Sequence, residues 1–326
     1  MSHPLPTSHQ DNLVRWSPEN STGMYESHFF KFNLPDDTRA FWCRFTILQR
    51  DSGPYAFEVW NIVFDTEVPE QSFALKERFD VSSVNITKDH FELRFGEQTI
   101  GHGHSDGVLK NEQHRVRWNV CWTTPDRGLR HFPQQSMYEG GFPKTKLLSP
   151  APNSRFHGSL DIDGSLYNFS DAPGMQGHNW GRQHAESWVW AHCNAFDTPG
   201  VVFEGATSSI RVGPMKSPPL TLLHFALPNE EPLTINSWAS MVASTGRRTE
   251  LRWRFRGHQG NRGIEGWFQA PPERFVGVHY EDPSSTISNC LNSKIADGQV
   301  RLLHKDNGVW KLKTLYEANA TAALEI

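Results

Sequence analysis

Apolar and polar side chains alternate along much of this chain, so the dominant period is two residues. The clearest alternating runs cover residues 91–95, 115–122, 156–162 and 251–256. Successive side chains of a β-strand point to opposite faces, and a half-buried antiparallel strand therefore alternates in this way. The pattern predicts an all-β chain.

Two short sequences, Asp163-Gly164 and Asp306-Asn307-Gly308, predict tight turns between strands. Glycine and asparagine tolerate the positive φ angles that such hairpin turns need. Two stretches, residues 70–77 and 236–244, favour short helices, and neither is strongly amphipathic. Helix is therefore expected to be a minor component of the fold.

The length of the chain, 326 residues, is sufficient for two domains with separate cores. Residues 1–22 are polar and lack periodicity, which predicts an N-terminal leader that is mobile or wraps around the protein. Proline and glycine cluster in residues 171–181, which predicts a crossing between two β-rich halves. We therefore expect an N-terminal β domain over residues 23–183 and a C-terminal β-barrel domain over residues 184–326.

The segment around residues 175–194 carries the most distinctive chemistry of the chain. If a strand starts at residue 186, one of its faces carries Glu186, Trp188, Trp190, His192 and Asn194. The other face carries Ser187, Val189, Ala191 and Cys193. Large aromatic side chains mixed with an acid, an imidazole and an amide are typical of a ligand cavity. The alternative is a core strand whose polar atoms bond to one another.

The same segment resembles the signature of a known superfamily. The matching residues are His178-Asn179-Trp180-Gly181, Trp188-Val189-Trp190 and Cys193-Asn194, and looser matches occur at Tyr25-Glu26, 57–65, 143–146 and 280–283. They resemble tocopherol cyclases, bacterial carotenoid 1,2-hydratases and AttH-like proteins, and more distantly the fungal decalin-forming cyclases. The resemblance implies two lipocalin-like (calycin-type) antiparallel β-barrel domains packed together, with ligand space in a barrel mouth or between the barrels. It selects no single reaction, because members hydrate, cyclise or have no known activity.

Carbocation or pericyclic chemistry requires an acid, aromatic faces and a shell that excludes water. Trp180, Trp188 and Trp190 provide aromatic faces that can bind a substrate. Glu186 is the preferred catalytic acid because it shares the face of Trp188 and Trp190, and Glu204 is the next candidate. Burial raises the pKa of a carboxyl group and keeps it protonated near neutrality. The alternative for Glu186 is a solvated turn residue.

Two histidines and two asparagines complete the predicted site. His178 and His192 can act as an acid, a base or an anchor for a carbonyl or phenol, or can instead bond to the backbone. Asn179 and Asn194 can orient a substrate oxygen or hold a loop. We assign the histidines to catalysis and the asparagines to substrate binding.

A metal site is a competing interpretation. His102 and His104 are two positions apart, and His178, His184 and His192 are close in sequence. Structural zinc sites favour tighter sets of four ligands, often with paired cysteines. The family resemblance implies no metal, and the sequence contains no P-loop and no dinucleotide fingerprint. We expect neither a metal nor a cofactor.

The composition disfavours several classes of partner. Charged residues make up 21% of the chain and the net charge is −4, without acidic or basic blocks, which argues against nucleic acid or an anionic membrane. The sequence lacks a signal-peptide pattern, and no apolar run approaches the roughly 20 residues of a membrane helix. The four cysteines are widely spaced, as is typical of buried thiols in a reducing compartment. We therefore expect a cytoplasmic protein without an integral membrane segment.

These observations predict a cofactor-independent enzyme of secondary or isoprenoid metabolism. It would cyclise, isomerise or hydrate a largely apolar or aromatic small molecule by acid/base catalysis in a Trp-lined cavity. Two alternatives are a non-catalytic lipocalin-type carrier of a hydrophobic small molecule and a cyclase of an indolic or phenolic pigment precursor. A carboxyl group directed into the cavity would favour the enzyme over the carrier. The sequence does not select the substrate or the oligomeric state.

Overall fold

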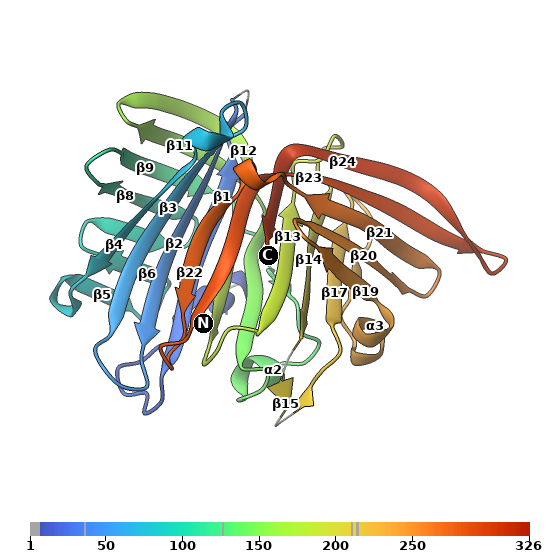
Figure 1. Ribbon diagram of the computed structural model, residues 1–326, viewed down its shortest axis with the longest axis horizontal. Helices are drawn as coiled ribbons and strands as arrows, with labels where there is room; N and C mark the ends of the chain where they lie inside the picture. The colour runs from blue at the N-terminus through green and yellow to red at the C-terminus, as the bar shows by residue number, and fades with distance from the viewer. Residues whose placement is uncertain (1–6, 36, 126, 210, 213–214) are drawn as a thin grey trace, which may run out of the picture.

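Two large curved antiparallel sheets make up most of the protein (Figure 1). The computed structural model describes residues 7–326 except 36, 126, 210, 213 and 214. The predicted leader therefore lies partly outside the described residues, because positions 1–6 are not among them. The prediction of an all-β, lipocalin-like fold is confirmed.

The first sheet contains 12 strands within the described residues. In order of pairing they are β4 (Phe73–Phe79), β3 (Ala56–Asp65), β2 (Arg39–Gln49), β1 (Met24–Asn33), β12 (Ser165–Gly181), β11 (Thr145–Ile162), β9 (Arg115–Trp122), β8 (His104–Lys110), β7 (Gln98–Gly101), β6 (Glu92–Phe95) and β5 (Val84–Thr87), with β10 (Leu129–Arg130) beside β11. The concave side of this sheet encloses an aromatic core that includes Phe30, Phe32, Phe41, Trp118 and Phe156.

The second sheet contains 10 strands, again counted over the described part of the chain. In order of pairing they are β18 (Leu233–Ile235), β17 (Leu220–Ala226), β14 (Val202–Ser209), β13 (Ser187–Cys193), β24 (Val309–Glu325), β23 (Ile287–Asp306), β21 (Arg262–Gln269), β20 (Arg252–Gln259) and β19 (Thr245–Thr249), with β22 (Val276–Glu281) beside β23. Its own core includes Phe203, Phe225, Trp253, Phe255 and Phe268. A separate small ribbon pairs β15 (Arg211–Val212) with β16 (Met215–Lys216).

The helical elements are short. They are α1 (Thr7–Asn12), α2 (Ser136–Glu139), α3 (Trp238–Ala243) and the 3₁₀ turns η1 (Pro69–Gln71), η2 (Val81–Ser83) and η3 (Pro272–Arg274). The helix predicted at residues 236–244 is confirmed by α3, which begins after Ser237, whose side chain accepts a hydrogen bond from the Ser240 N–H. No helix in the described ranges is long and apolar enough to cross a membrane.

The prediction of a helix at residues 70–77 is wrong. That stretch forms η1 and then β4, which pairs with β3 along the edge of the first sheet. Hydrogen bonds to a neighbouring strand override a weak local helix propensity. Both predicted hairpin turns are confirmed, since positive φ angles occur at Asp163 and Gly164 between β11 and β12, and at Asn307 and Gly308 between β23 and β24.

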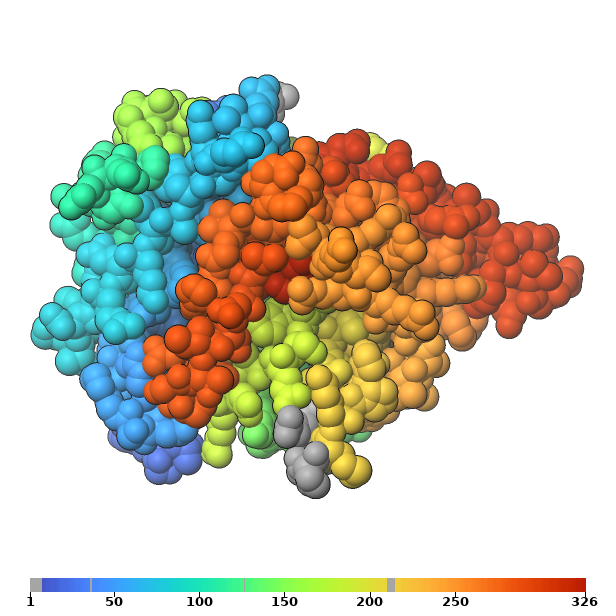
Figure 2. Space-filling model, viewed as in Figure 1, coloured from blue at the N-terminus to red at the C-terminus, as the bar shows by residue number. Residues whose placement is uncertain are grey.

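A third apolar cluster joins the two sheets. Phe29, Trp42 and Met175 come from the outer side of the first sheet, and Trp190 and Tyr280 come from the second. Strand β22 extends beside the first sheet, and the space-filling view shows this orange segment lying against blue residues (Figure 2). The predicted domain boundary at residues 183/184 falls in the connection from β12 to β13, while residues 171–181 belong to β12. The division into two domains stays a prediction.

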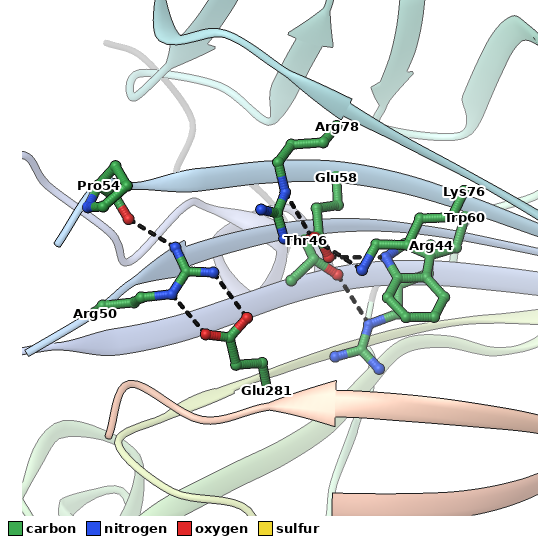
Figure 3. A network of polar contacts seen from close by, with 9 residues as sticks. All are labelled: Arg44, Thr46, Arg50, Pro54, Glu58, Trp60, Lys76, Arg78 and Glu281. Carbon is green, nitrogen blue, oxygen red and sulfur yellow. Dashed lines mark hydrogen bonds and ion pairs between the residues drawn. The ribbon is translucent and has the colours of Figure 1, made fainter. Parts of the chain in front are cut away.

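One ion pair fastens β22 to the first sheet. Arg50, which follows β2, donates hydrogen bonds from Nε and Nη2 to the two carboxylate oxygens of Glu281, at 2.5 and 2.7 Å (Figure 3). A bidentate arginine–carboxylate pair fixes both distance and orientation. Next to it, Glu58 of β3 contacts Lys76 and Arg78 of β4. The Arg50–Glu281 pair holds Tyr280 and the residues that follow β22 close to the first sheet.

Candidate active site between the two sheets

A cavity of about 130 Å³ lies between the two sheets. Strands β1, β2, β11 and β12 of the first sheet and β13, β14, β17, β22 and β24 of the second contribute to its wall. The residues with polar or aromatic side chains in this wall include Tyr25, Trp42, Arg44, Thr145, Asn179, His184, Trp188, Trp190, Tyr280 and Glu325. An aromatic cavity with a few polar groups is the usual form of a small-molecule site.

Strand β13 supplies the aromatic wall of this cavity. Trp188 and Trp190 line it, whereas Val189, Ala191 and Cys193 pack in the core of the second sheet. The alternation expected from the sequence is therefore present, because neighbouring residues of a strand face opposite sides of the sheet. Trp190 is 5% exposed and its Nε1 donates a hydrogen bond to Glu204 Oε1 at 3.0 Å.

His184 and Asp282 form a hydrogen-bonded pair at the cavity. His184 Nδ1 lies 2.6 Å from Asp282 Oδ1, and the backbone N–H of His184 donates to the same oxygen at 2.8 Å. The imidazole stacks on Tyr25, with ring centroids 4.0 Å apart. Its Nε2 atom is buried and has no hydrogen-bond partner among the described residues. One backbone donor and one ring nitrogen on the same carboxylate oxygen thus fix the orientation of the ring.

The protonation state of His184 follows from its surroundings. Burial lowers the pKa of His184, and the Asp282 carboxylate opposes this shift only in part. The neutral ring therefore dominates at neutral pH. Because Nδ1 faces a carboxylate, the proton of the neutral ring resides on Nδ1, and Nε2 presents a lone pair. This arrangement is suited to a general base.

Arg44 places a cation in the same cavity wall. Its guanidinium donates to Ser27 Oγ at 2.6 Å and to Thr46 Oγ1 at 3.0 Å, the latter contact being drawn in Figure 3. It lies 4.2 Å from the centroid of the Tyr280 ring. No carboxylate in the described part of the chain forms an ion pair with Arg44. A buried cation that bonds only to hydroxyls retains attraction for a negatively charged oxygen.

Further polar groups line the cavity. The Tyr25 and Thr145 hydroxyls share a hydrogen bond, and burial raises the pKa of Tyr25, so the phenol stays protonated. Asn179 Oδ1 is buried without a partner within the described residues. Glu325 is held by Lys294 and Asn292, each at 2.9 Å. The wall therefore offers a pair of hydroxyls, one amide and one ion-paired carboxylate.

Glu204 and His192 lie deeper than the aromatic wall. Glu204 is fully buried, accepts a hydrogen bond from Ser149 Oγ at 2.8 Å and lies 3.1 Å from His131 Nε2. Burial raises the pKa of Glu204, but His131 and His192 favour the carboxylate and lower that pKa to about 2. Glu204 is thus ionised near neutrality, which differs from the protonated acid that the sequence predicts.

His192 and Asn194 make contacts to backbone carbonyls. His192 Nε2 lies 2.7 Å from the Pro152 carbonyl, and burial lowers the pKa of His192 to about 3. Asn194 Nδ2 donates to the Gly174 carbonyl at 2.7 Å. Both side chains connect β13 or the residues after it to the first sheet. Neither belongs to the cavity wall.

Glu186 lies at the surface. Its carboxylate is 3.5 Å from Lys216 Nζ, and it contributes to a shallow hollow of about 40 Å³ beside the main cavity. Strand β13 begins at Ser187, so Glu186 belongs to the exposed connection before it. This placement differs from the expected buried acid next to Trp188 and Trp190. Its assignment as the acid stays a prediction that mutation can test.

His178 and Trp180 face the opposite side of β12 from Asn179. His178 Nε2 lies 2.9 Å from Glu26 Oε1, and its Nδ1 lies 2.6 Å from the Asp11 carbonyl. The Glu26 carboxylate also accepts the backbone N–H groups of Arg15 and Trp16, at 2.8 and 2.6 Å. His178 thus helps to anchor the segment after α1 over the end of the first barrel, outside the cavity between the sheets.

One group of three metal-ligand side chains converges in the described part of the chain. Glu26, His28 and His178 bring their ligand atoms within 4.8 Å of one another. His178 and two backbone N–H groups already occupy the Glu26 carboxylate. His184 and His192 do not join this group. The absence of a metal stays a prediction.

The site predicted from the sequence does not include His184, Asp282 or Arg44, although His184 is considered there as a metal ligand. His184 stands only three residues after the family signature, and Asp282 lies within the looser match at 280–283. No spacing rule joins two residues that are 98 positions apart. The two residues meet only because the fold places the end of β22 beside the β12–β13 connection.

Comparison with known proteins places the chain in a family. A profile described as tocopherol cyclase-like matches residues 147–326. The chain belongs to the tocopherol cyclase-like family. This family, whose name derives from a cyclase, includes enzymes. Two relatives from Mycobacterium tuberculosis, MT0513 of strain CDC 1551 / Oshkosh and Rv0493c of strain H37Rv, are each 27% identical over 307 residues, covering 89% of this chain and 84% of theirs.

Solved structures of low sequence identity share the fold of this tocopherol cyclase-like chain. An AttH-type protein from Nitrosomonas europaea has a TM-score of 0.56 at 10% identity, covering 93% of this chain and 92% of that protein. Kievitone hydratase from Nectria haematococca has a TM-score of 0.57 at 10% identity, with coverage of 98% and 92%. CghA has a TM-score of 0.58 at 10% identity, with coverage of 99% and 92%, and was also crystallised with Sch210972.

Proposed function

We propose that this protein is a cofactor-independent enzyme that cyclises, isomerises or hydrates a largely apolar small molecule in the cavity between its two sheets. The observation on which this rests is the His184–Asp282 pair: His184 lines an aromatic cavity, and its buried Nε2 atom has no hydrogen-bond partner among the described residues. A binding protein needs no oriented base, so the pair favours an enzyme over a carrier. The family and the hydratase among the structural neighbours support the same class.

Arg44 and His184 suggest how the reaction starts. A carbonyl or phenol oxygen of the substrate binds near Arg44, whose charge stabilises negative charge that develops on that oxygen. His184 Nε2 accepts a proton from an adjacent carbon or from a water molecule, and Asp282 stabilises the resulting imidazolium. Return of the proton to another atom completes an isomerisation or cyclisation. In a hydration, the hydroxyl of the activated water adds to one carbon of the double bond and the imidazolium returns the proton to the other carbon.

The tryptophans support a particular kind of substrate. Trp42, Trp188 and Trp190 offer apolar area and ring faces, which bind a hydrocarbon or aromatic body and stabilise adjacent positive charge. Indolic or phenolic rings stack on the same surfaces. The preferred substrate is therefore a polyketide, isoprenoid or indolic molecule that carries at least one oxygen function.

Mass spectrometry of a metabolite mixture tests the proposal while the substrate is still unidentified. Purified protein is incubated with an apolar extract of its source cells, and the products are compared with those from His184→Gln. We expect one compound to disappear while an isomer, or a product heavier by one water, accumulates only with the original protein. His279→Gln serves as the control, because His279 is exposed on β22 and hydrogen bonds to Asn289.

The outcomes separate the enzyme from the carrier. Equal conversion by the original protein and His184→Gln would contradict the proposed base. If a compound co-purifies with both proteins and is never converted, the protein is a carrier.

A further inference from the structure

A second and larger cavity, of about 490 Å³, lies at the end of the first barrel. The segment after α1, helix α2 and the ends of β11 and β12 surround it. It lies on the other face of β12 from the proposed active site, since Trp180 lines this cavity whereas Asn179 lines the active site. None of the chemistry proposed above uses it.

The floor of this second cavity is apolar and aromatic. Tyr138, Leu148 and Trp180 form a buried cluster, and Met24 packs against it. All four residues line the cavity. The Tyr138 hydroxyl accepts a hydrogen bond from the Phe132 backbone N–H at 2.8 Å, which fixes the ring. An apolar or aromatic group can therefore lose contact with water on this floor.

The rim of the second cavity is cationic. Its lining contains five cationic side chains and two carboxylates: Arg15, Arg130, Lys144, Lys146 and Arg182, with Asp11 and Glu139. Asp11 is already paired with Arg130 at 2.6 Å, and Glu139 accepts a hydrogen bond from Gln135 at 2.7 Å. This excess of positive charge stands out on a chain whose net charge is −4.

Four of the cations have no ion-pair partner among the described residues. These are Arg15, Lys144, Lys146 and Arg182. Lys144 donates to Gln183 Oε1 at 2.9 Å, and the buried Lys146 donates to the Pro143 carbonyl. Burial and the nearby Arg182 both lower the pKa of Lys146. An anion placed between Lys146 and Arg182 would relieve their repulsion.

We propose that this second cavity binds a small molecule in which a carboxylate or phosphate group is joined to an apolar or aromatic body. The anionic group lies among Lys144, Lys146 and Arg182, where it forms charge-assisted hydrogen bonds. The body packs against Trp180, Tyr138 and Met24. The active-site cavity suits such a ligand less well, because it is smaller and, apart from Lys146, which lines both cavities, its lining offers one cation without an ion-pair partner, Arg44.

Isothermal titration calorimetry with phenyl phosphate tests this site. We expect one phenyl phosphate bound per chain, and weaker binding as salt is raised. Arg182→Gln and Lys144→Gln, both at exposed positions, should each raise the dissociation constant roughly tenfold, as expected for loss of one charge-assisted contact. Lys313→Gln is the matched control, since Lys313 is an exposed lysine on β24 outside this lining.

Partial probes test the two halves of the ligand separately. Benzyl alcohol and inorganic phosphate should each bind at least roughly tenfold more weakly than phenyl phosphate. If benzyl alcohol bound as tightly as phenyl phosphate, the anionic group would not be required. If inorganic phosphate bound as tightly as phenyl phosphate, the apolar floor would not contribute to binding. No detectable binding of phenyl phosphate, or full binding by Arg182→Gln and Lys144→Gln, would overturn the site. The experiment measures binding alone, so its result is independent of the proposed catalytic activity.

Discussion

His184 Nδ1 lies 2.6 Å from Asp282 Oδ1, although the two residues are 98 positions apart in the sequence. Asp282 follows β22, which the Arg50–Glu281 ion pair holds against the first sheet. The β12–β13 connection brings His184 to the same place. The candidate base is therefore built where the second sheet contacts the first, and it depends on that contact for its orientation.

The pH dependence of turnover tests the role of Asp282. Activity should fall as pH drops through the pKa of His184, which burial holds below its usual value of about 6.5. In Asp282→Asn the imidazolium loses its partner, so the acidic limb of the pH–rate profile should move to lower pH and the maximal rate should fall. An acidic limb that stays in place would show that another group titrates.

Arg44 should contribute mainly to the rate. Arg44→Met removes the cation and should lower turnover roughly 10²- to 10³-fold, the usual effect of losing one donor to a developing oxyanion. Arg44→Lys keeps the charge and should recover part of that loss. Steady-state kinetics on both variants, with urea unfolding as a check on stability, provide the measurement. Equal rates for the two variants would indicate a packing role.

Substitution of Glu186 and of Glu204 should change the free energy of unfolding by very different amounts. Glu186→Gln alters an exposed residue and should change the free energy of unfolding by at most about 0.5 kcal/mol. Glu204→Gln removes the buried carboxylate that faces His131 and Ser149, and it should lower the free energy of unfolding by about 3 kcal/mol. Urea unfolding of both variants measures this, and turnover of Glu186→Gln decides whether Glu186 is the acid that the sequence predicts.

Acid should destabilise the protein through His192. Burial lowers the pKa of His192 in the folded state to about 3, so the unfolded chain binds more protons below about pH 6.5. The stability that the neutral ring confers is present above that pH and is lost as pH falls. When the pH falls from about 7 to about 5, the free energy of unfolding of the original protein should drop by about 2 kcal/mol more than that of His192→Gln. His90→Gln, at an exposed position, should show the original slope.

Glu26 should hold the N-terminal segment in place on the first sheet. In Glu26→Gln the side-chain amide would replace one acceptor oxygen near the Arg15 and Trp16 N–H groups, and His178 would lose its anion. We expect a loss of about 3 kcal/mol of unfolding free energy, measured with urea. Hydrogen exchange at residues 11–16 should also quicken. Glu19→Gln, an exposed change in the same segment, should have neither effect.

Much of the fold could be predicted because its signals are local. The period-two runs specify strands, and the Asp-Gly and Asn-Gly turns specify hairpins, since both depend on neighbouring residues alone. The same parity correctly separated Trp188 and Trp190 from Val189 and Ala191. It could not tell that β13 begins one residue after Glu186, because strand ends depend on pairing with β14 and β24.

The sequence by itself determined the all-β fold, the hairpins and the two faces of β13, because alternation and turn chemistry act over a few residues. Only the tertiary structure decided which residues share a compartment. His178 and Asn179 are adjacent in sequence, yet the sheet separates them, since successive side chains of β12 point to opposite faces. His184, Asp282 and Arg44 come together through the packing of the second sheet on the first, which depends on contacts between residues far apart in the chain.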